Sequence, residues 1–376
     1  MNPIIKWAGG KEKELPYIMK ALPKEFDRYV EPFVGGGSVY FNLNINNSII
    51  NDKSDELIGL YNRIQKRDEK FIQNLNNINK DWIKIESIIE KNYSELKDIY
   101  SLYCECFEKK DELEAKAFLK NKADYFIKNH KKELEEVISN DFNIDVDNFI
   151  FETKKNLISK MSRMNSIEKK KGKLSEKDLY DNIECAFKSA YYMHFRNLYN
   201  HPEKYENDKS LYTAIFYFVR EFCYASMFRY NADGKFNVPY GGISYNRKDF
   251  TKKINYLSSN KLTDYMSNTK IYCNDFEKFM NEIKLKKTDF IFLDPPYDTE
   301  FSTYAMNEFN KSDQVRLAEF LKNTEAKFML IIKNTDFIYN LYNDPKFKIQ
   351  VFDKNYLVSF QNRNDKKVEH LLITNY

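Results

Sequence analysis

The chain has 376 residues, more than one compact domain usually holds, so its length predicts a core domain with an insertion or a second domain. Its 60 basic and 56 acidic residues leave a net charge of +4, which excludes a histone-like protein with a wholly basic surface. Five cysteines without paired spacing argue against a disulfide framework and a metal site, and no apolar run reaches the roughly 20 residues of a membrane span. We therefore expect a soluble, cytoplasmic protein.

The first region, residues 1–64, predicts strands that alternate with helical stretches. Short apolar strands are expected at 28–30 and 48–50. The first strand leads into three glycines at 35–37, and the second ends at Asp52. This alternation is typical of a parallel, doubly wound sheet.

The middle region, residues 65–269, is charged and mostly helical in pattern. Apolar residues at helical spacing run through 118–138, and a second, strongly apolar helical stretch covers 211–228. The charged run at 168–173 is predicted to be an exposed loop. We interpret this region as a helical domain inserted into the sheet domain.

The strand pattern returns after residue 269. The predicted strands cover residues 271–273, 289–293, 327–332, 347–352 and 368–374. We expect the last two to form an antiparallel pair that closes the sheet. The simplest architecture is one mostly parallel sheet built from residues 1–64 and 270–376, with residues 65–269 as an inserted helical domain.

The strongest chemical signal is Asp294-Pro295-Pro296-Tyr297, which directly follows the apolar strand at 289–293. In open α/β sheets, ligands bind beyond the carboxyl ends of strands, where this tetrapeptide is expected. Asp294 and the Pro295 carbonyl can each accept a hydrogen bond from an amino group on an aromatic ring, which frees the nitrogen lone pair for attack. Tyr297 offers a ring on which an extruded base can stack. The alternative is an ordinary strand-terminating turn.

A second signal lies between Glu31 and Ser38, where the glycines at 35–37 follow the first strand. Glycines let a backbone approach a ligand closely, but a plain turn remains open as an alternative. The segment lacks the Gly-Lys-Ser/Thr of a phosphate-binding loop. Asp52 favours a nucleotide, because an acidic residue at the end of the next strand can bind ribose hydroxyls. The Asn-Asp-Phe sequence at 274–276 repeats the pattern and is predicted to bracket an adenine ring.

Several motifs follow one another in a set order. They are Lys6-Trp7-Ala8-Gly9-Gly10-Lys11, Glu31-Pro32-Phe33-Val34-Gly35-Gly36-Gly37-Ser38, Asp52, Arg229-Tyr230-Asn231, Gly234-Lys235-Phe236-Asn237-Val238-Pro239-Tyr240-Gly241, Asp294-Pro295-Pro296-Tyr297 and Lys366-Lys367-Val368-Glu369-His370-Leu371-Leu372. This series resembles the Dam-like (D12 class) DNA N6-adenine methyltransferases. The resemblance implies an α/β, Rossmann-like S-adenosylmethionine-dependent methyltransferase sheet with an inserted, largely helical DNA-recognition domain.

The resemblance also implies a set of cofactor and catalytic residues. S-adenosylmethionine would be bound by Trp7, Lys11, Phe33, Gly35, Gly37, Ser38, Asp52, Asp275, Phe276 and Asp294. In this set Trp7 and Lys11 would lie against the methionine end, and Asp52 would take the ribose. The catalytic motif, Asp294, Pro295, Pro296 and Tyr297, would act on an adenine extruded from the duplex.

For the DNA, the resemblance implies contacts from Lys6, Tyr224, Met227, Arg229, Asn231 and Pro239. Arg229 matches a position that reads guanine, while a phosphate contact or a structural salt bridge is its alternative. The resemblance implies GATC or a related sequence as the site. Ala225 stands where relatives specific for GATC commonly have Asn, so a contact with the duplex is expected to differ from theirs. Residues 105–208 exceed what the family usually holds and form an extra insertion.

Other functions remain as alternatives. Cytosine N4, RNA adenine and a glutamine amide also present conjugated amino groups, but Asp294 argues against glutamine and the stretch around Arg229 favours duplex DNA. A non-catalytic DNA-binding regulator on the same fold is the alternative from another class. Duplex DNA is the expected partner, with a cognate restriction endonuclease as a further candidate.

Overall fold

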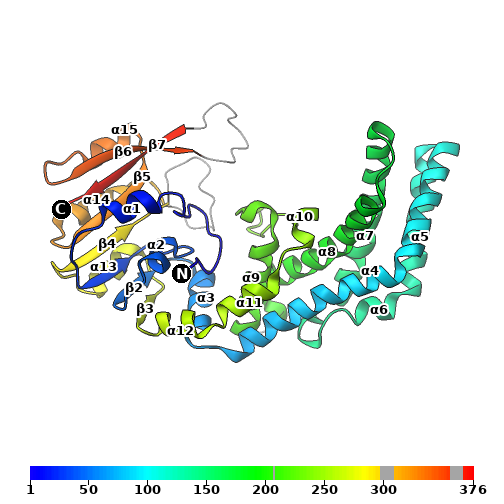
Figure 1. Ribbon diagram of the computed structural model, residues 1–376, viewed down its shortest axis with the longest axis horizontal. Helices are drawn as coiled ribbons and strands as arrows, with labels where there is room; N and C mark the ends of the chain where they lie inside the picture. The colour runs from blue at the N-terminus through cyan, green and yellow to red at the C-terminus, as the bar shows by residue number, and fades with distance from the viewer. Residues whose placement is uncertain (206–207, 297–308, 356–366) are drawn as a thin grey trace. The chain divides into compact units, whose positions relative to one another are not determined.

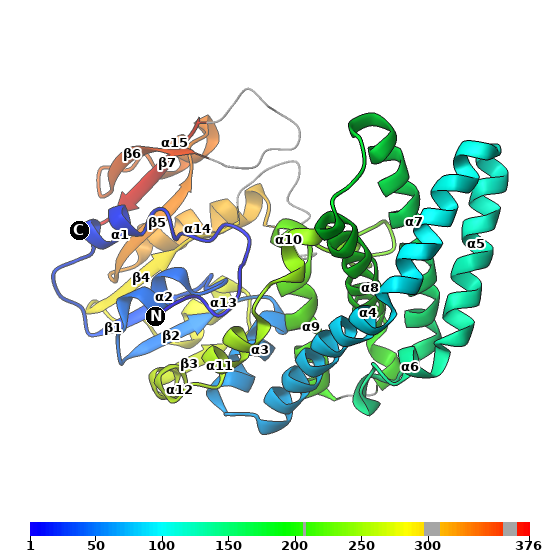
Figure 2. The ribbon, with the colours of Figure 1, turned by 45° about the vertical axis from the view of Figure 1, so that its right-hand side comes forward.

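The computed structural model describes residues 1–376 apart from 206–207, 297–308 and 356–366. The chain divides into two compact units. The first comprises Met1–Arg67, Phe228–Tyr230 and Leu257–Tyr376, and the second comprises Asp68–Met227 and Asn231–Tyr256. The first unit carries the sheet and the second is built of helices (Figures 1 and 2).

The sheet of the first unit has seven strands. They are β1 (Arg28–Glu31), β2 (Ser48–Asn51), β3 (Thr269–Tyr272), β4 (Asp289–Leu293), β5 (Lys327–Lys333), β6 (Lys348–Asn355) and β7 (Lys367–Thr374). Their order across the sheet is β3-β2-β1-β4-β5-β7-β6; β1 to β5 run parallel, and β7 runs antiparallel to β5 and β6. The predicted fold class and antiparallel closing pair are confirmed, although β3 begins two residues earlier than predicted.

Helices cover both faces of this sheet, as the reversal of strand order beside β1 requires. One face packs against α13 (Phe276–Glu282), α14 (Lys311–Asn323) and α15 (Asp336–Tyr342), whose apolar residues share a core with β1, β4 and β5. The helices α2 (Ser38–Leu43), α3 (Asp55–Gln65) and α12 (Asn260–Ser267) belong to the other face. There the Tyr40 hydroxyl lies 2.6 Å from Thr269 Oγ1. The short helix α1 (Leu15–Ala21) precedes β1.

The second unit is a bundle of helices of very different lengths. They are α4 (Glu69–Lys109), α5 (Glu112–Asn129), α6 (Lys131–Glu135), α7 (Val146–Lys171), α8 (Glu176–Tyr199), α9 (Lys209–Phe222), α10 (Ile243–Asn246) and α11 (Phe250–Leu257), with 3-10 turns η1 (Asn140–Phe142), η2 (Pro202–Tyr205) and η3 (Tyr224–Ser226). Among the residues that the structure describes, no helix is both long and apolar enough to cross a membrane.

The longest helix, α4, starts where Asp68 accepts a hydrogen bond from the Phe71 backbone N–H at 3.0 Å. No glycine or proline interrupts it, and Phe71, Leu75, Ile78 and Trp82 are buried at helical spacing. This stripe faces α8 and α9. The helical pattern predicted for the middle region therefore reflects a true bundle core.

Trp82 is at the centre of that core, with the rings of Phe218 and Phe222 at centroid distances of 5.7 and 4.6 Å. Beside it Lys188 is fully buried, with its ammonium 2.6 Å from Glu184 and 2.5 Å from Glu86. A buried cation is tolerated because carboxylates surround it.

The prediction of a loop at 168–173 is wrong for its first four residues, because α7 continues to Lys171. Three lysines in the last turn suit the negative end of the helix dipole. Gly172 then ends the helix with a φ of +87°, which a glycine adopts without strain.

The apolar stretch at 211–228 is helical only to Phe222, so its predicted end is also wrong. Cys223 turns into an extended conformation and forms an antiparallel bridge with Tyr240. Pairing with a distant segment, and not a local breaker, ends α9.

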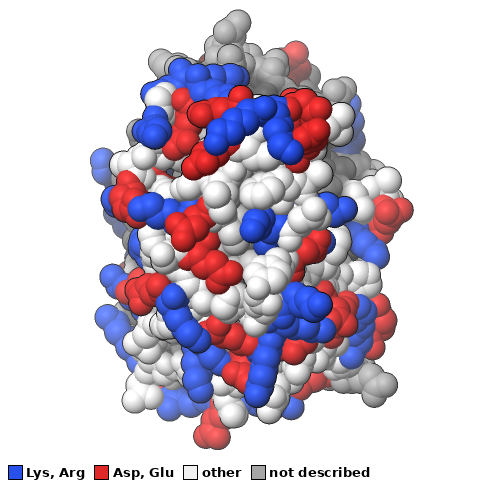
Figure 3. Space-filling model, turned by 90° about the vertical axis from the view of Figure 1, so that its right-hand side faces the viewer, with Lys and Arg blue, Asp and Glu red and all other residues white. Residues whose placement is uncertain are grey.

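The surface on which α5 lies mixes positive and negative side chains (Figure 3). Some are paired, for example Lys116 with Glu112 within α5 at 2.5 Å, and Lys110, which follows α4, with Glu114 of α5 at 2.9 Å. Such exposed pairs contribute little stability individually. The described part of this face is a solvated surface of mixed charge.

Candidate active site

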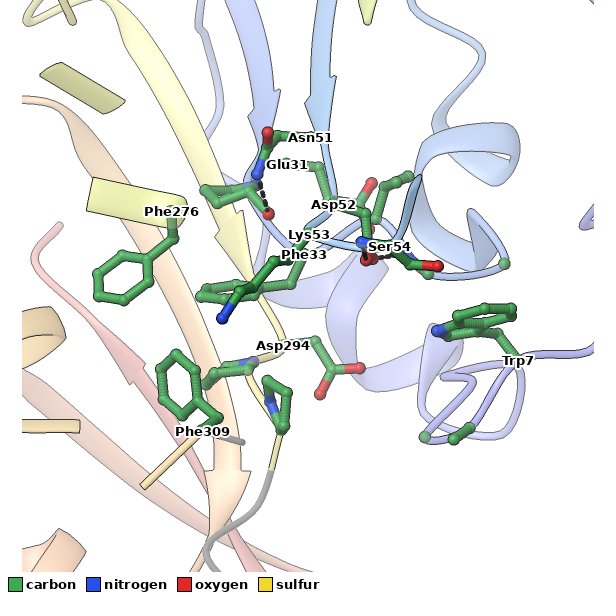
Figure 4. Close-up of a pocket in the computed structure, with 18 of the residues that line it drawn as sticks. Trp7, Glu31, Phe33, Asn51, Asp52, Lys53, Ser54, Phe276, Asp294 and Phe309 are labelled. Carbon is green, nitrogen blue, oxygen red and sulfur yellow. Dashed lines mark hydrogen bonds between the residues drawn. The ribbon is translucent and has the colours of Figure 1, made fainter. Parts of the chain in front are cut away.

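A cavity of about 430 Å³ lies within the first unit, beyond the carboxyl ends of β1, β2, β3 and β4 (Figure 4). Its lining comes from residues 7–11, 31–36, 38–39, 51–54, 274–276 and 294–296, with Phe228, Phe292, Phe309, Asp313, Arg316 and Lys333. β1 and β4 are neighbours at the point where the strand order reverses. This is where open α/β sheets bind their ligands.

The glycine-rich turn after β1 is held close to the N-terminal loop. Gly35 has a φ of +49°, and a Cβ there would lie 3.0 Å from the Trp7 ring. Gly37 has a φ of +78°, and a Cβ there would lie 2.6 Å from Phe41 and Tyr61. Gly35 and Ser38 line the cavity, whereas Gly37 does not and packs on the side of α2 and α3. The two glycines therefore serve different parts of the turn.

Asp52 directly follows β2, and its carboxylate reaches the backbone of this turn. Its carboxylate accepts hydrogen bonds from the Gly35 N–H at 3.1 Å and the Ser54 N–H at 3.0 Å. Burial raises the pKa of Asp52 above its ordinary value. Further donors would stabilise the ionised carboxylate, and ribose hydroxyls are donors of this kind.

Three phenylalanine rings form one wall of the cavity (Figure 4). Phe33 lies 5.6 Å from Phe276 and 5.5 Å from Phe309, and the last two lie 5.6 Å apart, all between ring centroids. These residues come from three segments: the turn after β1, the start of α13 and the approach to α14. Such a wall suits a flat, aromatic ligand.

Asp275 and Phe276 follow β3, as the sequence predicts. The Asp275 carboxylate caps α13 by accepting from the Glu277 N–H at 3.0 Å. Burial acts to raise the pKa of Asp275, but the hydrogen bonds and charge of Arg316, together with backbone N–H donors of Glu277 and Lys278, outweigh it and hold that pKa below its ordinary value. Asp275 therefore presents a charged carboxylate beside the phenylalanine wall.

Arg316 is a cavity residue that the sequence analysis missed. Its guanidinium donates to Asp275 at 3.2 and 3.1 Å, to Glu277 at 2.5 Å and to Asp313 at 2.7 Å, and its Cζ lies 4.7 Å from the centroid of the Phe276 ring. It thereby ties α14 to the start of α13. Nothing in the pattern of an ordinary amphipathic helix marks this residue.

Asp294 and Pro295 directly follow β4 and line the cavity, as predicted. The Lys11 ammonium lies 2.5 Å from Asp294 Oδ2 and 2.7 Å from the Gly9 carbonyl. The resemblance assigned Lys11 to the methionine end of a cofactor, and the structure adds this direct ion pair with the motif aspartate. The Pro296 carbonyl accepts a hydrogen bond from Gln314 at 3.2 Å, while Tyr297 lies outside the described residues.

Glu31 also lines the cavity, although the sequence motif that contains it predicts no role for this residue. It is buried, and its Oε2 accepts a hydrogen bond from the Tyr29 hydroxyl at 2.7 Å. Burial raises the pKa of Glu31 well above its ordinary value, and the nearby Asp294 charge adds to this shift. A positively charged ligand group would lower the cost of ionising it.

The residues expected to contact DNA fall in both units. Lys6 and Arg229 are exposed in the first unit. In the second unit Tyr224 and Pro239 are joined by a hydrogen bond from the Tyr224 N–H to the Pro239 carbonyl at 2.8 Å, and Met227 ends the same turn as Tyr224.

Asn231 has a clear structural role within its own turn. Its Oδ1 accepts from the Lys235 backbone N–H at 2.8 Å, and its Nδ2 donates to Asp233 at 3.3 Å. These bonds shape the turn that follows Arg229. A contact to DNA stays a prediction for Asn231.

The fold is that of a doubly wound α/β protein with a cavity at the point where its strand order reverses. The family model described as D12 class N6 adenine-specific DNA methyltransferase matches residues 7–129 and 125–358. Because these matches cover most of the chain, the chain belongs to this family. The resemblance inferred from the motifs is confirmed, and so is methylation of adenine N6 in DNA as the activity.

The chain is also similar to named methyltransferases over nearly their full length. Type II methyltransferase M.CviBI of Paramecium bursaria Chlorella virus NC1A is 25% identical over 100% of both chains. Type II methyltransferase M.MjaIII of Methanocaldococcus jannaschii is 26% identical over 100% of this chain and 99% of its own. The DNA adenine methylase of Escherichia coli K12 is 23% identical over 98% and 93%.

Proposed function

We propose that this chain binds S-adenosylmethionine in the cavity of the first unit and uses it to methylate adenine N6 within a specific duplex DNA sequence, GATC or a related one. The observation that carries the proposal is the convergence of Asp52, the phenylalanine wall and Asp294-Pro295 on one cavity. Family membership supports the reaction, and the residues that line the cavity support the proposed place for it.

The chemistry of the cavity fits each part of S-adenosylmethionine. The wall of Phe33, Phe276 and Phe309 suits its adenine ring, and the buried Asp52 carboxylate suits two adjacent ribose hydroxyls. The methionine end carries positive charge, for which the buried Glu31 is a matching group. When bound, the cofactor supplies a methyl group on a cationic sulfur, which makes that carbon electrophilic.

The residues after β4 then act on the nucleophile. The amino nitrogen of adenine is planar and weakly nucleophilic, because its lone pair is delocalised into the ring. Asp294 and the Pro295 carbonyl would each accept one N–H, which favours a pyramidal nitrogen with a directed lone pair. N6 gains a methyl group and loses one proton, and Asp294 is the group we propose to receive it.

Fixed positions of these acceptors would supply much of the acceleration. The ion pair with Lys11 holds the Asp294 carboxylate, and the bond from Gln314 holds the Pro296 carbonyl one residue further on. We propose Lys11 as a positioning residue on this evidence.

We assign the second unit, with the exposed Tyr224, to recognition of the DNA target. Adenine N6 inside a duplex is reached by flipping the base, which costs a few kcal/mol of stacking and pairing. We propose that the enzyme works in the cytoplasm of a bacterium or a phage-infected cell. A restriction endonuclease that cuts the same sequence is its proposed protein partner.

The test is a transfer assay with methyl-labelled S-adenosylmethionine and unmodified duplex DNA, comparing wild type with Asp294→Ala. We expect wild type alone to produce N6-methyladenine, identified by mass after digestion to nucleosides. Asp98→Ala, which removes an exposed carboxylate on α4, is the matched control and should keep full activity. Label in RNA but not in DNA, or equal transfer by Asp294→Ala, would contradict the proposal.

A further inference from the structure

The turn that follows α9 contains two consecutive residues in a conformation that side chains disfavour. Ala225 and Ser226 have φ values of +51° and +52°. Left-handed backbone is easy for glycine and tolerated by asparagine, but strained for other residues. Two such residues in succession need something outside the turn to hold them.

Arg220, on the last turn of α9, provides that hold. It is 2% exposed, and its guanidinium donates to the Met227 carbonyl at 2.6 Å and to the Ser226 carbonyl at 2.8 Å. The same guanidinium lies 5.7 Å from the centroid of the Phe236 ring. Two nitrogens of one planar fork thus engage two successive carbonyls, a geometry that the single ammonium of a lysine does not reproduce.

The turn itself adds little to the core of the second unit. Tyr224 is 43% exposed, Ala225 is exposed, and no residue of Tyr224–Ser226 is buried. The Gly241 N–H donates to the Phe222 carbonyl at 3.0 Å, which anchors the backbone just before the turn. The buried Arg220 therefore stabilises the conformation of an exposed turn.

We propose that Arg220 is a positioning residue for DNA recognition, which holds the turn from Cys223 to Met227 in the shape that presents Tyr224 to the duplex. This inference rests on the proposed function, because it assumes that the turn contacts DNA. Arg220 acts through the backbone of the turn and has no contact with the substrate. Without it, only a fraction of molecules would hold the binding-competent turn, and DNA affinity would fall by that fraction.

The experiment replaces Arg220 with methionine, which has a similar reach but no donors. The Kd for a duplex containing the target site is expected to rise about tenfold or more, while the Kd for S-adenosylmethionine, whose cavity is in the first unit, stays at the wild-type value. Arg220→Lys keeps a buried cation and should give a smaller rise. It also serves as the test if the methionine variant does not fold.

A rescue separates this role from general stability. Asparagine followed by glycine is the preferred pair for two left-handed residues, so Ala225→Asn with Ser226→Gly should restore DNA binding to Arg220→Met. The two turn substitutions are also made in the wild-type protein, which keeps Arg220, because the new asparagine could itself contact DNA. The inference requires that the two turn substitutions improve DNA affinity more in Arg220→Met than in the wild-type protein.

Arg196→Met is the matched control, since Arg196 donates to the Val238 carbonyl at 3.2 Å in the same unit. Its effect on DNA binding should be insensitive to the two turn substitutions. Wild-type DNA affinity in Arg220→Met, or an equal gain from the turn pair in both backgrounds, would overturn the inference. A wild-type enzyme that neither binds nor methylates duplex DNA would instead overturn the proposed function.

Discussion

Lys11→Met is expected to lower kcat about 100-fold and to leave the affinity for S-adenosylmethionine nearly unchanged. The Lys11 side chain is 2% exposed and holds both Asp294 and the Gly9 carbonyl. Removing one partner of a buried pair costs about 3–5 kcal/mol, but Asp294 is 17% exposed, so water offsets part of that cost. A remaining loss of about 2.7 kcal/mol in orientation of the carboxylate corresponds to a factor of about 100 in rate.

Single-turnover methylation with DNA prebound measures the rate, and calorimetry measures cofactor affinity. Lys13→Met, two residues along and exposed, is the control and should behave as wild type. The reasoning fails if Lys11→Met weakens cofactor binding tenfold while single-turnover rate is unchanged. In that case Lys11 serves the methionine end, as the motif resemblance implies, and its ion pair with Asp294 is incidental.

Two further predictions concern other parts of the chain. Arg316→Met should raise the Kd for S-adenosylmethionine roughly fivefold, because Asp275, Glu277 and Asp313 lose their shared cation. Arg67→Met, which removes an exposed arginine, is the control and should leave this Kd unchanged. Equal cofactor affinities of Arg316→Met and wild type in calorimetry would refute this role of Arg316. Burial lowers the pKa of His194 to about 4, so between pH 6.5 and 4 the unfolded chain binds a proton that the folded chain does not. Stability should therefore fall by about 3 kcal/mol as the pH drops through this window, and urea titrations of His194→Gln should lack that loss.

The sheet could be predicted because its signals are local. Each strand of the parallel core contains at least two adjacent apolar or aromatic residues and ends near polar residues, and the bounds predicted for the strand at 289–293 are correct. Since parallel strands end at the same edge of a sheet, residues after different strands were expected to meet. Asp52, Asp275 and Asp294 do line one cavity, although their roles stay proposals.

The remaining features depend on contacts that sequence spacing does not reveal. Lys11 and Asp294 are 283 residues apart in the sequence, and nothing in the residues around either one predicts their ion pair. Arg316 sits in a helix whose pattern is ordinary, so only the packing of α14 beside α13 shows its place in the cavity. The end of α9 was missed for the same reason, since Cys223 leaves the helix to pair with Tyr240.

The pairing of β2 with β3 has a consequence for how the chain matures. These neighbours are separated in sequence by the whole second unit, so β1 and β2 leave the ribosome long before residues 269–293 exist. Domains generally fold as units during synthesis, and closing a long loop costs only slightly more than closing a short one. The helical unit is therefore expected to fold before β3 and β4 are synthesised. During that time Ile49 and Ile50 of β2 lack their neighbouring strand and stay exposed to solvent. A nascent chain stopped at this stage would be a stable helical body bearing an unfinished, aggregation-prone sheet edge.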